Sequence, residues 1–251
     1  MPKFAANLSF LFPELNFLDR FAAARAAGFK AVEFAFAYEH PAAEIAADAA
    51  AANVEIVLMN LPPGDWGAGE RGLAALTGRE GEFRASLETA LAYAQVCGCR
   101  QLHAMAGAGT GCQEAAYIAN LRYAATRLAL TGIRLLIEPI NDRDMPGYFL
   151  TRPDQAAALI ERVGIANLFL QLDFYHCQVM RGDLASQVET HFPLIRHIQI
   201  AGNPGRHEPD LGEINYPFLF ALIDRLGYEG WIGCEYSPVG DTRTGLGWLK
   251  P

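Results

Sequence analysis

The chain alternates short apolar runs with alanine-rich runs, and it does so eight times. The apolar runs have the length and turn boundaries of buried strands, and the runs between them have the period of helices. Strands are predicted at residues 4–9, 30–37, 54–60, 101–105, 133–138, 168–173, 195–200 and 231–235. Helices are predicted at residues 14–27, 42–52, 80–96, 113–130, 154–162, 184–191 and 217–226.

Eight strands alternating with helices in 251 residues favour an α/β fold of the (β/α)8 TIM barrel type. A doubly wound sheet is the alternative, but it usually has a glycine-rich phosphate-binding turn after the first strand. The corresponding turn here, Leu11 to Glu14, contains no glycine. No linker or low-complexity stretch divides the chain, so residues 1–251 are predicted to form a single barrel domain.

Charge and cysteine content narrow the class of protein. The formal net charge is -8, which argues against a nucleic-acid or anionic-membrane partner. No apolar run reaches 18 residues, and the start of the chain lacks a signal-peptide pattern. Five cysteines without framework spacing are typical of reduced thiols, so we expect a cytoplasmic protein that binds a small molecule. The sequence leaves open whether the chain forms a homo-oligomer.

Four predicted strands in the second half each end in a residue that can bind a cation through oxygen. These residues are Glu138, Asp173, Gln199 and Glu235, separated by 35, 26 and 36 positions. Alternate residues of a strand face opposite sides, and the apolar residues of these strands suit the helix-facing side. All four oxygen ligands are therefore predicted to face the barrel axis at the carboxyl ends of neighbouring strands, where barrel enzymes have their active sites.

Three carboxylates at one place repel one another and are costly to bury. A divalent cation removes that cost, and a set of oxygen ligands without cysteine favours Mg²⁺ or Mn²⁺ over zinc. Each residue alone is an ordinary strand-end side chain. Four of them with the same orientation on consecutive strands predict a metal site.

Several motifs spread over nearly the whole chain identify a likeness to a known family. They are Asn7-Leu8-Ser9, Ala31-Val32-Glu33-Phe34, Asn60-Leu61-Pro62, Gly64-Asp65-Trp66, Glu138-Pro139-Ile140-Asn141, Leu172-Asp173-Phe174-Tyr175-His176, His197-Ile198-Gln199-Ile200-Ala201 and Gly233-Cys234-Glu235-Tyr236. With these residues the chain resembles the hydroxypyruvate isomerase family, within the xylose isomerase-like barrel superfamily. Sugar epimerases of that superfamily usually carry a histidine where this chain has Gln199.

The resemblance implies a metal-dependent isomerase that interconverts hydroxypyruvate and tartronate semialdehyde through a cis-enediolate. Glu138 and Glu235 would be metal ligands that also transfer protons, and the choice of base between them stays open. Asp173 and Gln199 would be ligands only. The resemblance further implies that His176 and Arg206 bind substrate oxygens, although a capping histidine and a solvated arginine are the plainer interpretations.

Other polar residues at strand ends are weaker candidates for substrate contacts. His103 faces inward near the end of its strand, where a core histidine is an equal alternative. Asn7, Tyr38 and Asn60 end the first three predicted strands and are candidates to line the pocket.

Four other functions are alternatives. A 2-oxo-tetronate isomerase would use the same residues on a substrate one carbon longer, which sequence does not resolve. A sugar epimerase of the same superfamily is a more distant alternative. A metal-dependent DNA-repair endonuclease needs more histidine ligands and a basic groove, whereas this chain has six histidines and an acidic balance. A sugar-acid binding protein would not need two glutamates poised for proton transfer.

Overall fold

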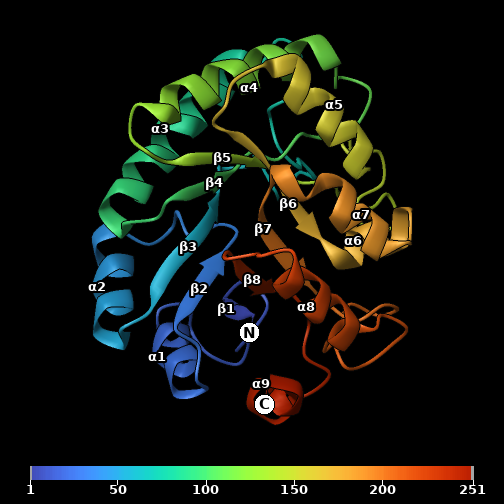
Figure 1. Cartoon of the computed structure of the whole chain (residues 1–251). Coiled ribbons are helices and arrows are strands. Elements are labelled where there is room, and N and C mark those ends of the chain that lie inside the picture. Colours follow the sequence, from blue (N-terminus) through green and yellow to red (C-terminus); the bar gives the residue numbers. More distant parts are fainter. Residues whose placement is uncertain (1, 250–251) are drawn as a thin grey trace.

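Eight parallel strands pair in sequence order and close into one barrel in the computed structural model, which describes residues 2–249. Figure 1 shows the strands at the centre with helices around them. The strands are β1 (Lys3–Asn7), β2 (Ala31–Phe34), β3 (Glu55–Asn60), β4 (Gln101–His103), β5 (Arg134–Ile137), β6 (Leu168–Asp173), β7 (Ile195–Ile200) and β8 (Trp231–Cys234). The predicted single-domain TIM barrel is confirmed.

Helices connect the strands and cover the outside of the barrel. They are α1 (Asp19–Ala26), α2 (Ala42–Ala52), α3 (Glu80–Cys97), α4 (Glu114–Ala129), α5 (Pro153–Val163), α6 (Phe174–Met180), α7 (Leu184–His191), α8 (Tyr216–Arg225) and α9 (Thr242–Gly245), with short 3-10 helices η1 (Phe192–Leu194) and η2 (Leu246–Leu249). None of the described helices is long and apolar enough to cross a membrane.

Local sequence explains where these helices begin and end. In α5, Pro153 occupies the first turn, where its missing N–H costs nothing, and Gly164 ends the helix with φ of 68°. Between these ends Leu159 and Ile160 face the barrel and are buried. Each such side chain contributes about 1.5–3 kcal/mol when it leaves water, so the apolar stripe holds the helix against the strands.

Three regions differ from the sequence-based prediction. The first helix begins at Asp19 rather than residue 14, because residues 12–19 form separate turns, in which the Leu15 N–H donates to the Phe12 carbonyl and the Asp19 N–H to the Asn16 carbonyl. Phe12 has a positive φ of 60°, and its N–H donates to Thr242. The short helix α6 was not predicted; it starts directly after β6, where the Asp173 side chain caps the Tyr175 N–H at 2.7 Å.

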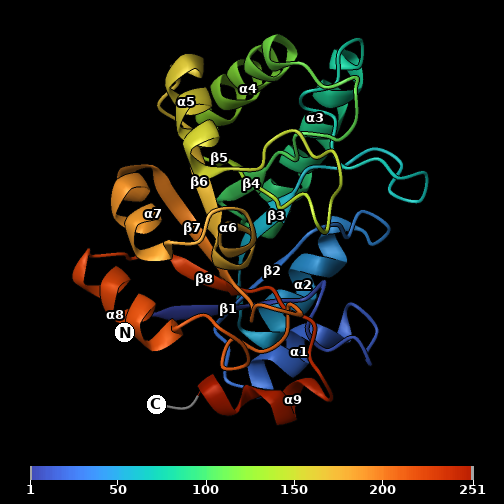
Figure 2. The ribbon, with the colours of Figure 1, turned by 90° about the vertical axis from the view of Figure 1, so that its right-hand side faces the viewer.

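The C-terminal segment, which was also not predicted, returns to the start of the chain (Figure 2). Trp248 of η2 packs edge-on against Phe4 of β1 and donates its ring N–H to the Tyr236 hydroxyl. The segment after β8 therefore covers the joint at which β8 meets β1 and the barrel closes.

Register at the barrel rim places the functional strand ends next to each other. Asp173 of β6 is paired with Gln199 of β7, which is paired with Gly233 of β8, two residues before Glu235. The predicted alternation of side chains is therefore confirmed from β6 to β8. Polar side chains gather at the carboxyl end of the barrel.

Two buried tyrosines provide a test of the core. Tyr117 in α4 is fully buried, and its hydroxyl has no partner among residues 2–249, whereas the Tyr216 hydroxyl exchanges two hydrogen bonds with the backbone of Ala201. Removing an unpaired buried hydroxyl removes a desolvation cost, so Y117F should raise the free energy of unfolding by about 1 kcal/mol, whereas Y216F should lower it by about 1–3 kcal/mol. Urea unfolding of both variants checks this. A loss of stability in Y117F would contradict it.

Candidate active site

The four predicted ligand residues lie at one end of the barrel. Glu138, Asp173 and Gln199 are almost completely buried, and the side chain of Glu235 is 15% exposed. Glu138 and Glu235 each stand one residue beyond their strand, while Asp173 and Gln199 belong to theirs. The apolar neighbours of these residues pack in the core between barrel and helices, as the alternation predicts.

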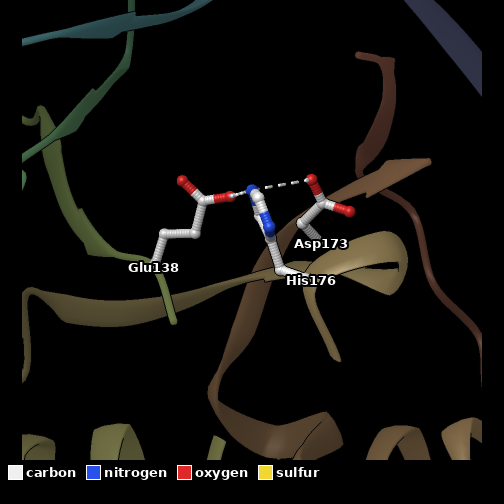
Figure 3. Close-up of side chains that lie close together, drawn as sticks. All are labelled: Glu138, Asp173 and His176. Atoms are coloured by element: carbon white, nitrogen blue, oxygen red, sulfur yellow. Dashed lines mark ion pairs between the residues drawn. The ribbon is translucent and has the colours of Figure 1, made fainter. Parts of the chain in front are cut away.

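A close cluster joins Glu138, Asp173 and His176 (Figure 3). Their possible ligand atoms all lie within 4.8 Å of one another. His176 Nε2 lies between the two carboxylates, 3.9 Å from Glu138 Oε1 and 3.6 Å from Asp173 Oδ2. Both of these oxygens are buried and accept no hydrogen bond from the described part of the chain. Buried carboxylate oxygens that accept no hydrogen bond are the environment that a bound cation satisfies, so the site fits a divalent metal.

Two donors compete for the neutral ring of His176. The Asp144 N–H donates to Asn141 Oδ1 at 2.8 Å, which sets the orientation of the Asn141 amide and leaves Asn141 Nδ2 at 2.6 Å from His176 Nδ1. Arg206 Nη2 lies 3.3 Å from His176 Nε2. Burial lowers the pKa of His176 well below its ordinary 6.5, so the ring is neutral and can accept through only one nitrogen. The Asn141 contact is the shorter, so we assign Nδ1 as the acceptor and Nε2 as the protonated nitrogen, and interpret His176 as a hydrogen-bond donor facing the site rather than as a third ligand.

Arg206 supplies positive charge at the same place. Its Nη2 lies 3.2 Å from Glu235 Oε1 and 3.7 Å from Asp173 Oδ2. The guanidinium also lies over the rings of Phe10 and Tyr175, which hold it in position. It therefore links the two carboxylates and can bind an anionic group of a ligand.

Crowding raises the pKa of the carboxylates. Burial, and then the charges of Glu235 and Asp173, raise the pKa of Glu138 well above its ordinary value. Burial likewise raises the pKa of Asp173 to about 6 and that of Glu235 to about 8, although Arg206 opposes both shifts. Without a cation the site therefore retains protons that a bound metal would displace.

Gln199 and Glu235 line a small cavity next to the cluster. Its volume is about 20 Å³, enough for one water molecule or ion, and Glu138 also lines it. The Gln199 amide is already bonded on both sides: Nε2 donates to Glu33 at 2.8 Å, and Oε1 accepts from Gln171 at 2.6 Å. Glu138 thus belongs both to the cluster with Asp173 and to the lining of the cavity that Gln199 and Glu235 share. Their metal-binding roles remain predictions.

A larger pocket of about 330 Å³ opens above these residues. Of the predicted substrate contacts it is lined by His176, Arg206, His103 and Asn60, together with Glu138 and Glu235. Phe10, Phe36, Trp66, Met105, Ile140 and Met145 form its apolar side. The pocket therefore combines charged groups on its floor with an apolar wall, as small-molecule sites do.

His103 is neutral, because burial lowers its pKa to about 3. Its Nδ1 lies 3.2 Å from Asn60 Oδ1 and 3.7 Å from Glu138 Oε2, so it faces the pocket and supports both residues.

Two other predicted contacts lie elsewhere. Tyr38 does not line the pocket, because its hydroxyl is turned to the Asn60 carbonyl and donates to it at 2.5 Å. Asn7 lines only the small cavity, because its amide donates to Glu33 at 2.9 Å. Both hold the strand ends that the pocket rests on, and the structure does not support direct contact with a substrate.

A second cavity, of about 400 Å³, lies at the opposite end of the barrel. It is lined by residues at the starts of strands, including Arg134 and Ile195, and by the Gly227–Gly230 turn. Barrel enzymes carry their chemistry at the carboxyl ends of the strands, so the cavity containing Glu138 and Glu235 is the candidate active site.

Sequence reasoning missed a buried polar group below the site. Glu33 in β2 is completely buried and bonds to His197 of β7. A charged residue within the four-residue buried strand Ala31–Phe34 was the available signal, because the same alternation turns it toward the barrel axis. Asn141 was missed as well, because its role depends on a contact between two loops.

Known proteins match this chain along nearly its whole length. The sequence model of the xylose isomerase-like TIM barrel family matches residues 21–251. The chain belongs to the xylose isomerase-like TIM barrel family. A 2-oxo-tetronate isomerase from Cupriavidus necator is 56% identical over 100% of this chain and 98% of its own length. A hydroxypyruvate isomerase from Escherichia coli is 46% identical over 100% and 99%. The predicted family relationship is confirmed.

Solved structures of this family share the fold. A crystal structure described as AP endonuclease, family 2, from Brucella melitensis superposes with a TM-score of 0.98 at 50% identity, covering 99% of this chain and 98% of that one. A 3-keto-D-glucoside 4-epimerase from Escherichia coli superposes with a TM-score of 0.82 at 20% identity, covering 99% and 98%, which shows the fold alone.

The raised pKa values predict how stability depends on pH. The folded metal-free protein holds protons on Glu235 up to about pH 8, whereas the unfolded chain releases them near the ordinary pKa of 4.5. The native state then binds more protons, so stability should fall as pH rises from about 4.5 through about 8. His103 and His176 have lowered pKa values, so the unfolded chain binds their protons more readily than the folded protein does. These two residues therefore make stability rise with pH, but only below about pH 6.5.

Thermal unfolding between pH 7 and 9 measures this effect. The melting temperature of the metal-free protein should fall across this range. The fall should be smaller in E235Q, and smaller in the wild type with saturating Mg²⁺, because each removes the uptake of protons. A melting temperature that is flat or rises in the metal-free wild type would show that these carboxyl groups do not retain protons.

Proposed function

We infer that this protein is an isomerase that moves a carbonyl group between carbons 2 and 3 of a short hydroxy-oxo acid. The observation that carries this is the pair Glu138 and Glu235, two glutamates that line one pocket, with Arg206 beside Glu235 and Asp173. Its relatives with 56% and 46% identity over the whole chain are named isomerases of such acids.

Each residue has a task in this reaction. One of the two glutamates removes the proton from carbon 3, and the other delivers a proton to carbon 2. The hydroxyl proton on the carbon 3 oxygen moves to the carbon 2 oxygen, so the carbonyl group changes places without a net change in protons. The Nε2–H of His176 faces Glu138 Oε1 and Asp173 Oδ2. From this position it can donate to a substrate oxygen. Arg206 binds the substrate carboxylate.

Asp173, Gln199 and the two glutamates would hold Mg²⁺ or Mn²⁺, whose contribution when bound is Lewis-acid stabilisation of the charge that develops on the substrate oxygens. The apolar wall formed by Phe36, Trp66 and Met145 excludes water from the reacting carbons. The proton held by a carboxyl group is thereby kept for the substrate.

The four-carbon 2-oxo-tetronate is the substrate that we favour. The relative with this name is 56% identical, against 46% for the hydroxypyruvate isomerase that matched the first expectation from sequence. The 330 Å³ pocket also has room beyond a three-carbon acid. Hydroxypyruvate remains the second candidate, because the charged floor treats both acids alike.

The endonuclease alternative has less support, despite the name of the Brucella structure. The chain carries a net charge of -8, and the one cluster of possible metal ligands in residues 2–249 contains a single histidine. A nucleic-acid backbone needs a basic surface.

Proton NMR in D₂O with Mg²⁺ tests the proposed function. We expect enzyme-dependent loss of the carbon 3 proton signal from both 2-oxo-tetronate and hydroxypyruvate. We expect kcat/KM to be about 10-fold or more higher for the four-carbon acid, the range that one extra carbon in a pocket supplies. No exchange with either acid would refute the isomerase, and a preference for hydroxypyruvate would refute the four-carbon assignment.

Glutamine variants separate the roles of the two glutamates. E138Q and E235Q should each reduce net isomerisation by about 10²–10⁴-fold, because a positioned base is lost. One variant should still exchange the carbon 3 proton of the 2-oxo acid, and the other should still exchange the carbon 2 proton of its isomer. Substrate binding should persist in both, as measured by calorimetry. Full turnover in either variant would show that its glutamate transfers no proton.

A further inference from the structure

A buried carboxylate lies beneath the candidate site and has no part in the chemistry described so far. Glu33 of β2 is completely buried, and in the described structure its ion-pair partner is His197, itself fully buried. A carboxylate inside a protein is costly unless its oxygens are bonded. Glu33 therefore has either a structural role or a role toward the site above it.

Three side chains donate to the Glu33 carboxylate. His197 Nε2 lies 2.6 Å from Oε2, and Oε1 accepts from both Gln199 Nε2 at 2.8 Å and Asn7 Nδ2 at 2.9 Å. The barrel makes room for this group at Gly233, where an added Cβ would lie only 2.2–2.4 Å from the carboxylate. The network thus ties β1, β2 and β7 together and depends on a glycine in β8.

The carboxylate determines which way the Gln199 amide points. An ionised carboxylate only accepts hydrogen bonds, so the NH₂ group of Gln199 must face Glu33. The amide oxygen is then turned the other way, where it accepts from Gln171 and keeps a second lone pair. Gln199 lines the 20 Å³ cavity together with Glu138 and Glu235. A reversed amide would put its NH₂ group, a donor that repels cations, where the oxygen now stands.

We propose that Glu33 is a positioning residue: it holds the Gln199 amide so that its oxygen, not its nitrogen, is available to a divalent cation at the site. The idea rests on the metal requirement in the proposed function. Glu33 also lines the 20 Å³ cavity, but both of its carboxylate oxygens already accept hydrogen bonds, so we do not count it among the ligands. Its effect is exerted through the orientation of one ligand, and it should therefore appear first in metal affinity.

The structure supplies a conservative variant. In E33Q the amide oxygen can still accept from Gln199 and Asn7, while its NH₂ group donates to His197 Nε2. His197 then moves its proton to Nδ1, which has no partner among residues 2–249, so no hydrogen bond is lost. The Gln199 orientation survives in E33Q but not in E33L, which has no acceptor.

Titration of the metal-free protein with Mn²⁺, followed by the electron paramagnetic resonance signal of the free ion, tests the proposal. We expect E33L to bind Mn²⁺ about 10–100-fold more weakly than the wild type, and E33Q to stay within about threefold. G233A keeps the carboxylate but displaces it, and it should also bind more weakly than the wild type. It provides the test if E33L does not fold.

The control is Q101L. Gln101 of β4 is another buried polar side chain, whose amide donates to the Val57 carbonyl away from the site. Q101L should lose thermal stability and keep its Mn²⁺ affinity. If E33L, or G233A in its place, behaves like Q101L, Glu33 is merely structural. If E33Q loses as much affinity as E33L, its negative charge matters rather than the amide orientation. Either result overturns the proposal. If wild type and D173N bind Mn²⁺ equally, the proposed metal site itself fails.

Discussion

Repulsion among buried carboxylates is the constraint on which the rest of the site depends. Glu138, Asp173 and Glu235 share one end of the barrel, and Arg206 is the cation that pairs with two of them. Glu138 Oε1 and Asp173 Oδ2 accept no hydrogen bond from residues 2–249, and the pKa of every member of the trio is raised. A protein maintains such an arrangement when a cation or a transferred proton uses it.

The barrel makes this arrangement possible because its closure fixes the strand ends. Parallel pairing from β5 to β8 sets the rim residues side by side, and neither helix packing nor loop length needs to bring them together. Below the rim, the polar network around Glu33 holds the interior of the barrel rigid. The same strands thus provide the reactive groups and the supports that orient them.

Much of this was predictable from sequence, for physical reasons. The spacing of apolar residues predicted all eight strands. The alternation of side chains along each strand predicted that Glu138, Asp173 and Gln199 face the barrel axis. Contacts between distant segments were not predictable in this way. Tyr38 was predicted to end its strand, but β2 ends at Phe34 and the Tyr38 hydroxyl bonds to the Asn60 carbonyl. The tautomer of His176 depends on Asn141 and Asp144, which only the folded loops bring to it.

A crystal structure of the protein soaked with Mn²⁺, with anomalous scattering used to locate the ion, tests the central claim most directly. The account predicts one strong peak about 2.0–2.3 Å from oxygens of Glu138, Asp173, Gln199 and Glu235, with His176 Nε2 outside bonding distance. A peak bonded to His176 with Glu235 turned away, or no peak at the carboxyl end of the barrel, would contradict it.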